Sequence, residues 1–60
     1  MATRDDVLEA IHRIEKAGGA GDATRAAQAA LTLPLPASGF DGVLDRLRSA
    51  FPGILGPAGP

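Results

Sequence analysis

Residues 3–19 read TRDDVLEAIHRIEKAGG. This stretch contains the N-cap, the apolar face and the C-terminal stop expected of one α-helix. Thr3 is a good N-cap residue, and Asp6 three positions later gives a variant of the capping box. Val7, Ile11 and Ile14 are spaced four and three residues apart, with Leu8 beside them, which predicts one apolar stripe along the helix. The two glycines at the end provide a C-terminal stop. We therefore predict a helix over residues 3–17.

A second amphipathic segment lies near the other end of the chain. Ser38 followed by Asp41 repeats the capping pattern, so we expect Ser38 to be the N-cap. Pro52 and Gly53 stop the segment. The spacing of its large apolar residues predicts a helix over residues 39–51 with one apolar face, made of Phe40, Val43, Leu44, Leu47 and Phe51.

The middle of the chain is built from small residues and prolines. Residues 18–21 are a glycine-rich turn, after which Asp22 is a candidate N-cap for an alanine-rich helix over residues 23–31. The sequence LPLP at residues 33–36 cannot continue that helix, because proline lacks an N–H and restricts the residue before it. We expect a short connector resembling polyproline II.

These elements predict an all-α fold: a small three-helix bundle with a proline-rich connector. The three-helix domain covers residues 1–52, and residues 53–60 form a flexible Gly/Pro tail without regular structure. With 60 residues and no cysteine, the chain has a small core and no disulfide to support it. Association with a second chain is a common remedy, so we expect a homo-oligomer or an obligate protein partner.

The charge and composition argue against several classes of partner. Six Lys or Arg residues against seven Asp or Glu give a net charge of −1, with the two signs mixed along the chain. A nucleic-acid partner is therefore unlikely, and the absence of Trp and Tyr removes most stacking platforms. No apolar run reaches the ~20 residues of a membrane span, and no signal peptide is recognisable. We expect a cytoplasmic location.

Catalytic and metal-binding patterns are weak. The one histidine, His12, falls beside the apolar stripe, and its i, i+3 spacing from Glu9 is an isolated carboxylate–histidine pair. The glycine-rich turn lacks a preceding strand and a following Lys-Ser/Thr, so it is not a phosphate loop. A domain this small rarely encloses a pocket of ~300 Å³. We expect no enzyme, no cofactor, no metal and no small-molecule substrate.

Large apolar residues are frequent in the connector, the third helix and the tail. They could fold back to close the core, or remain exposed as a partner surface, and the two roles are not exclusive. We predict a non-catalytic protein–protein interaction module, an accessory or docking subunit of a larger complex. Its candidate partner-binding residues are Leu33, Leu35, Phe40, Val43, Leu44, Leu47, Phe51, Ile54 and Leu55.

The alternative function is a small DNA-binding regulator of the helix-turn-helix type. Three short helices suit that motif, and Arg46 and Arg48 would favour DNA. However, the turn of the motif is usually ~3–4 residues, and the connector here is longer and contains two prolines. Asp41 and Asp45 on the would-be recognition helix would repel phosphate.

Overall fold

The computed structural model describes residues 1–19 and 21–56, and all of its regular structure is helical. The helices are α1 (Arg4–Lys16), α2 (Asp22–Ala30), α3 (Ala37–Ala50) and the short α4 (Pro52–Leu55). No strand occurs among the described residues. The all-α, three-helix fold predicted from the sequence is confirmed.

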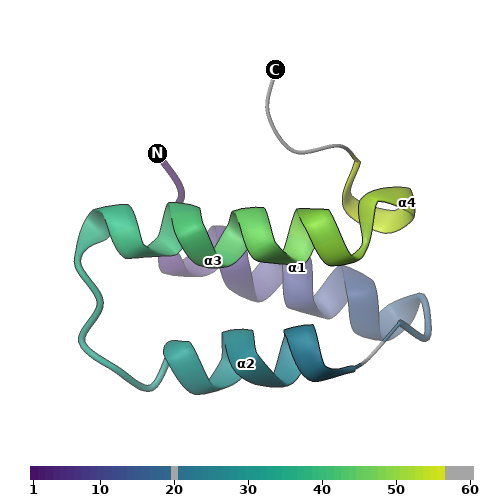
Figure 1. Cartoon of the computed structure of the whole chain (residues 1–60), viewed down its shortest axis with the longest axis horizontal. Helices are drawn as coiled ribbons and strands as arrows, with labels where there is room; N and C mark the ends of the chain where they lie inside the picture. Colours follow the sequence, from purple (N-terminus) through teal and green to yellow (C-terminus); the bar gives the residue numbers. More distant parts are fainter. Residues whose placement is uncertain (20, 57–60) are drawn as a thin grey trace.

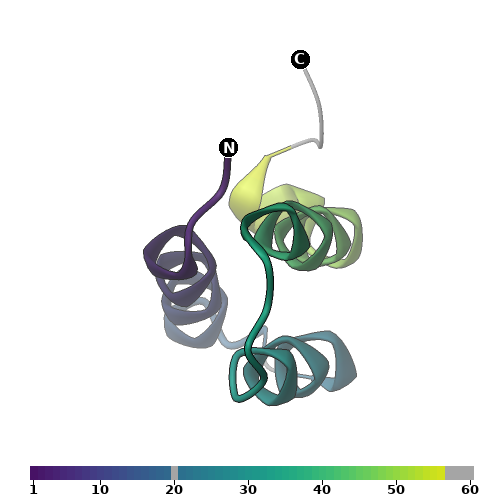
Figure 2. The ribbon, with the colours of Figure 1, turned by 90° about the vertical axis from the view of Figure 1, so that its left-hand side faces the viewer.

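The three long helices lie side by side along one direction (Figures 1 and 2). The chain runs along α1, returns along α2 and runs forward again along α3, so α1 and α3 point the same way. The short α4 follows α3 directly and packs against both α1 and α3. The seam between α1 and α3 is therefore bordered by α4 at the end where these two helices finish.

Helix α1 has the start and the stop that its sequence predicts. The Asp6 N–H donates to Thr3 Oγ1 at 3.3 Å, and the Thr3 N–H donates to Asp6 Oδ2 at 2.9 Å, which completes the capping box. At the other end Gly18 adopts a positive φ of 76°. The Gly19 N–H then donates to the Ile14 carbonyl at 2.9 Å, the long bond of a Schellman motif.

The start of α2 differs from the prediction by one residue. Gly21, and not Asp22, is the N-cap, and Asp22 is the first helical residue. Thr24 supplies the capping interactions instead: its hydroxyl accepts from the Gly21 N–H at 3.0 Å and donates to the Gly21 carbonyl at 2.7 Å. These two bonds also satisfy the hydroxyl of Thr24, which is buried.

The predicted cap of α3 is wrong. Pro36 occupies the N-cap position with an extended backbone, and Ser38 lies inside the first turn without a capping bond. Asp41, the expected partner of Ser38, faces the start of the chain, where its Oδ1 accepts a hydrogen bond from the Ala2 N–H at 2.6 Å. The backbone of Pro36 is extended through its ψ of 163°, and α3 begins directly after it.

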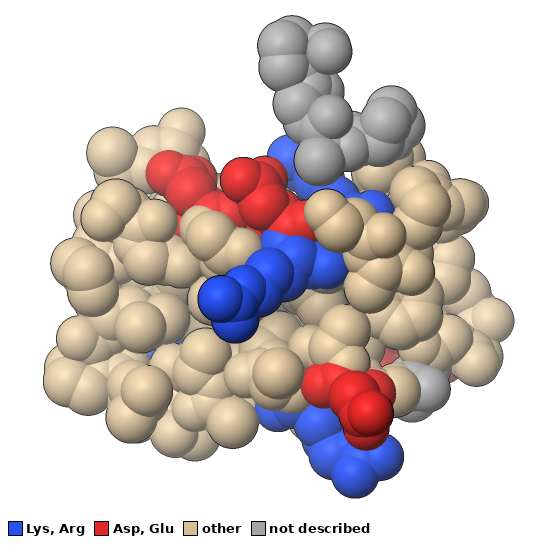
Figure 3. Space-filling model, viewed as in Figure 1, with Lys and Arg blue, Asp and Glu red and all other residues tan. Residues whose placement is uncertain are grey.

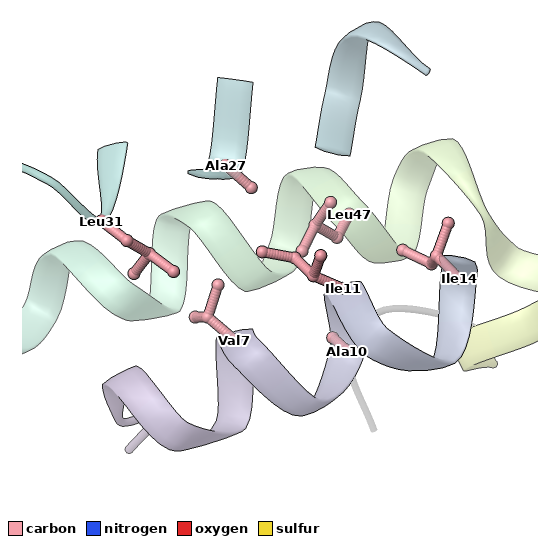
Figure 4. Packing of buried hydrophobic residues seen from close by; sticks show 7 residues of the cluster. All are labelled: Val7, Ala10, Ile11, Ile14, Ala27, Leu31 and Leu47. Atoms are coloured by element: carbon pink, nitrogen blue, oxygen red, sulfur yellow. The ribbon is translucent and has the colours of Figure 1, made fainter. Parts of the chain in front are cut away.

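Seven buried apolar residues from all three long helices and the turn after α2 form the core (Figure 4). Two of them are alanines, so the core is small. Val7, Ile14 and Leu47 have 0% of their surface exposed and are its largest fully buried members. The complete set is Val7, Ala10, Ile11, Ile14, Ala27, Leu31 and Leu47.

The connector bends more sharply than polyproline II. The Leu35 N–H donates to the Leu33 carbonyl at 2.9 Å, which closes a three-residue turn around Pro34. Pro36, with φ −67° and ψ 163°, has the backbone angles of polyproline II. The turn directs Leu35 back toward the start of α3, where its Cβ lies 3.3 Å from the position that a Cβ on Gly39 would occupy.

The tail is more ordered than expected. The prediction that residues from Gly53 onward lack regular structure is wrong for α4, because its turn is helical. Pro52 suits the first helical position, where no N–H is needed and its fixed φ matches the helix. Ile54 and Leu55 then pack against the core cluster. Residues 57–60 of the predicted tail lie outside the described part of the chain.

Candidate functional site

The nine residues predicted to bind a partner differ widely in exposure. Leu47 is 0% exposed in the core, so no partner can reach it in this structure. Leu33 is 56% exposed at the tip of the connector. The remaining seven are half-buried: Leu35, Phe40, Val43, Leu44, Phe51, Ile54 and Leu55.

These half-buried residues do not form one continuous face. Val43 lines a small hollow of about 40 Å³ between α2 and α3. Phe51 and Ile54 lie against Gly19, where an added Cβ would come within 3.2 Å and 3.1 Å of their side-chain carbons. Much of the predicted surface therefore closes the bundle, which is the first of the two roles expected for it.

Leu44 and Leu55 lie elsewhere, in a groove of about 420 Å³ along the seam between α1 and α3. Its apolar lining also includes Ala10 of α1 and the first two residues of the chain, Met1 and Ala2. We expected that so small a domain rarely encloses a pocket of ~300 Å³. The groove has a larger volume, but it is open and not enclosed, because most of its charged wall residues are exposed.

Five charged side chains line this groove, which we call the α1/α3 groove. They are Asp6, Glu9, Arg13, Asp41 and Arg48. No ion pair joins any two of them, and the ion pair found among the described residues, Arg25–Asp22 at 3.6 Å, lies on α2. The groove thus offers charges of both signs that do not neutralise each other by direct contact.

The two signs are separated along the groove for four of these side chains, and the fifth, Glu9, lies between the two ends. Because α1 and α3 run in the same direction, Asp6 and Asp41 from their early turns lie toward one end. Arg13 and Arg48 each come seven residues later on the same helices, which places them about 10 Å farther along. The result is an acidic end and a basic end over an apolar floor.

Each end of the groove is tied to a neighbouring segment. At the acidic end Asp41 holds the chain start through its bond from the Ala2 N–H. At the basic end Arg13 Nη2 donates to the Ile54 carbonyl of α4 at 3.3 Å. The groove is therefore bordered by the first residues at one end and by α4 at the other.

The surface charge is mixed over the face shown in Figure 3. Acidic and basic side chains lie next to each other there, and uncharged residues cover most of the area. Such a surface lacks the one-sided basic field that drives binding to phosphate backbones.

The helix arrangement also differs from a helix-turn-helix. Helices α2 and α3 run antiparallel beside each other, whereas that motif joins its helices at about 90–120°. Residues 31–36 connect α2 to α3, which is longer than the usual ~3–4-residue turn.

The charged groups of the α1/α3 groove are suited to binding through hydrogen bonds and ion pairs. Three of its carboxylate and guanidinium groups, those of Asp6, Glu9 and Arg13, are exposed, whereas acid–base catalysis relies on a site shielded from water. His12 is exposed on α1 and does not line the groove. Within residues 1–19 and 21–56, no three His, Asp or Glu side chains come together to hold a metal ion.

Sequence reasoning missed the groove, although a signal for it exists. Asp6 and Arg13 on one helix, and Asp41 and Arg48 on the other, share the same seven-residue spacing.

None of the helices described is both long and apolar enough to cross a membrane. No protein-family model, curated protein or solved structure matches the chain.

Proposed function

We propose that this protein is a non-catalytic interaction module, an accessory or docking subunit that binds another protein in the α1/α3 groove. One observation carries the proposal: a groove of about 420 Å³ is lined by five charged side chains that form no ion pair with one another. Leu44 and Leu55, two of the residues predicted to bind a partner, contribute apolar contact to the same groove.

A protein fits this groove better than the other partner classes. A small-molecule pocket usually buries most of its ligand, and this groove is open along its length. A nucleic acid needs a basic surface, and the groove carries three acidic and two basic side chains. Protein surfaces supply both signs of charge together with apolar side chains, which is the combination that the groove can match.

Self-association remains a prediction, and the total exposed area of the folded chain gives no sign of a large covered face. The accessible surface of the chain is 3881 Å², and a folded monomer of its mass is expected to expose about 3,650 Å². The bundle thus covers its surface nearly as well as an ordinary monomer. We therefore propose a second protein as the partner, with a second copy of the chain as the alternative occupant.

Site-specific crosslinking in the native cells tests the proposal. A photo-reactive amino acid replaces Glu9, an exposed residue of the groove wall, and in a control protein it replaces Ala29, an exposed residue of α2 outside the groove. We expect one protein to be crosslinked from position 9 and not from position 29. Far-UV circular dichroism of both proteins checks that the bundle is intact.

The alternatives give different results. Crosslinks between two copies of the chain from position 9 would identify a homo-oligomer. Crosslinks from position 29 alone, or from neither position, would contradict a docking role for the groove. A shift of labelled duplex DNA by the purified chain at physiological salt would support the DNA-binding alternative instead.

A further inference from the structure

Building on the proposed function, we infer that the α1/α3 groove recognises a short extended segment of its partner with one basic and one acidic side chain. These two side chains are two or four residues apart and point to the same side. The basic one meets the acidic end of the groove, and the acidic one meets its basic end.

The acidic end is built from two helices. Asp6 sits in the first turn of α1, where one carboxylate oxygen accepts the bond from the Thr3 N–H. Asp41 is half-buried on α3 and uses Oδ1 to accept from Ala2. Each carboxylate has a second oxygen, and a carboxylate can accept several hydrogen bonds. Lysine and arginine carry the donors that match these oxygens.

The basic end is built in the same way from Arg13 and Arg48. Arg13 uses Nη2 to donate to the Ile54 carbonyl, and a guanidinium has five N–H donors. Arg48 is half-buried in the last turn of α3. Two guanidinium groups with remaining donors are suited to a carboxylate, which they can bind through paired hydrogen bonds.

The length of the groove sets the spacing of the two charges on the partner. Seven residues of helix rise by about 10 Å between the acidic and the basic end. Residues two or four apart on an extended chain share one side and lie about 7 or 13 Å apart, which brackets that distance within the reach of long side chains. At a spacing of four, the residue midway between the two charges shares their side and would face Ala10 and Leu44 on the groove floor.

The length of the groove favours an extended segment over a helix. The chain start and α4 border its two ends, which limits the length of a segment that lies between them. A helical partner would need two turns to place charges about 10 Å apart on one side, and a helix that short is unstable on its own. An extended chain spans the same distance within about three to five residues.

Selection from a phage-displayed library of random heptapeptides tests this inference. We expect the selected peptides to be enriched in Lys or Arg paired with Asp or Glu at a spacing of two or four. The test variant is Arg48→Glu, which reverses one charge at the basic end. Its matched control is Arg46→Glu, the same change two residues away on an exposed position outside the groove.

Arg48→Glu should lower the binding of the selected peptides about three- to tenfold, the range expected when a partly exposed ion pair becomes a repulsion. It should also remove the preference for an acidic residue while keeping that for a basic one. Arg46→Glu should bind like the parent chain. Far-UV circular dichroism confirms that both variants are folded.

Three results would overturn the inference: no enrichment, enrichment without opposite charges, or equal effects of Arg48→Glu and Arg46→Glu. If crosslinking from position 9 still captures a protein in that case, the docking function stands and only the charge rule is wrong. If neither experiment detects binding, the docking function is wrong as well.

Discussion

Replacing Leu47 by alanine tests whether this residue closes the core or serves an interface. Leu47 is 0% exposed in the core cluster, so the substitution leaves a cavity among neighbours that cannot fully collapse. Buried Leu→Ala changes cost about 2–5 kcal/mol. A domain of this length has a total stability of about 3–9 kcal/mol, so the change removes a large share of it.

Thermal unfolding followed by circular dichroism measures the effect, at several concentrations of the purified chain. If the substitution lowers the free energy of unfolding by about 3 kcal/mol, and each kcal/mol lost lowers Tm by about 4–8 °C, Tm should fall by at least about 12 °C. Leu33→Ala is the matched control, because Leu33 is 56% exposed on the connector and its loss should cost less than about 0.5 kcal/mol. Equal losses of Tm in the two variants would refute the assignment of Leu47 to the core. A Tm of the parent chain that rises steeply with concentration would indicate that association, and not the lone bundle, stabilises the fold.

Further substitutions test the helix ends and α4. Gly42→Ala should raise the stability by about 0.5–1 kcal/mol in urea unfolding, because the position is helical and an added Cβ meets nothing within 4 Å. Gly18→Ala should lower it by about 1 kcal/mol, because φ is 76° there, and equal signs for the two glycines would contradict the structure. Thr3→Ala should cost about 1 kcal/mol through loss of the capping box, and an unchanged midpoint would exclude that cap. Gly19→Ala should cost about 1–3 kcal/mol and speed amide exchange in α4, because the new Cβ lies 3.1 Å from Ile54 Cδ1; unchanged exchange would show that α4 does not depend on this contact.

The features predictable from the sequence are those determined by neighbours in the chain. Thr3 and Asp6 are three residues apart, so the capping box of α1 depends on local geometry alone. The stripe of Val7, Ile11 and Ile14 likewise follows from helical period, and the structure buries all three, whereas Leu8, expected beside them, is 47% exposed. The three-helix fold could be predicted from the sequence for the same reason.

The errors concern choices that depend on distant partners. The pattern of Ser38 and Asp41 matches a capping box, but Asp41 bonds to Ala2, which is 39 positions away in the chain. Helix α4 is too short to be stable alone, and it forms because Ile54 and Leu55 pack against the core cluster. Local pattern cannot reveal either contact.

The candidate site shows the same division. Periodicity identified the apolar face of α3, but it could not distinguish Leu47, which is buried in the core, from Leu44, which lines the groove, because both lie on that face. The pairing of like charges at each end of the groove needs α1 and α3 to run in the same direction, which depends on how the whole chain folds back. Charges on two separate helices become one site only through that arrangement.

Amide NMR tests the central claim that the α1/α3 groove is the docking site. The isotope-labelled chain is titrated with the partner protein that crosslinking from position 9 identifies. We predict that the largest shift changes fall between Asp6 and Arg13 on α1 and between Asp41 and Arg48 on α3. Changes concentrated on α2 or on the connector around Leu33, with the groove amides unmoved, would contradict it.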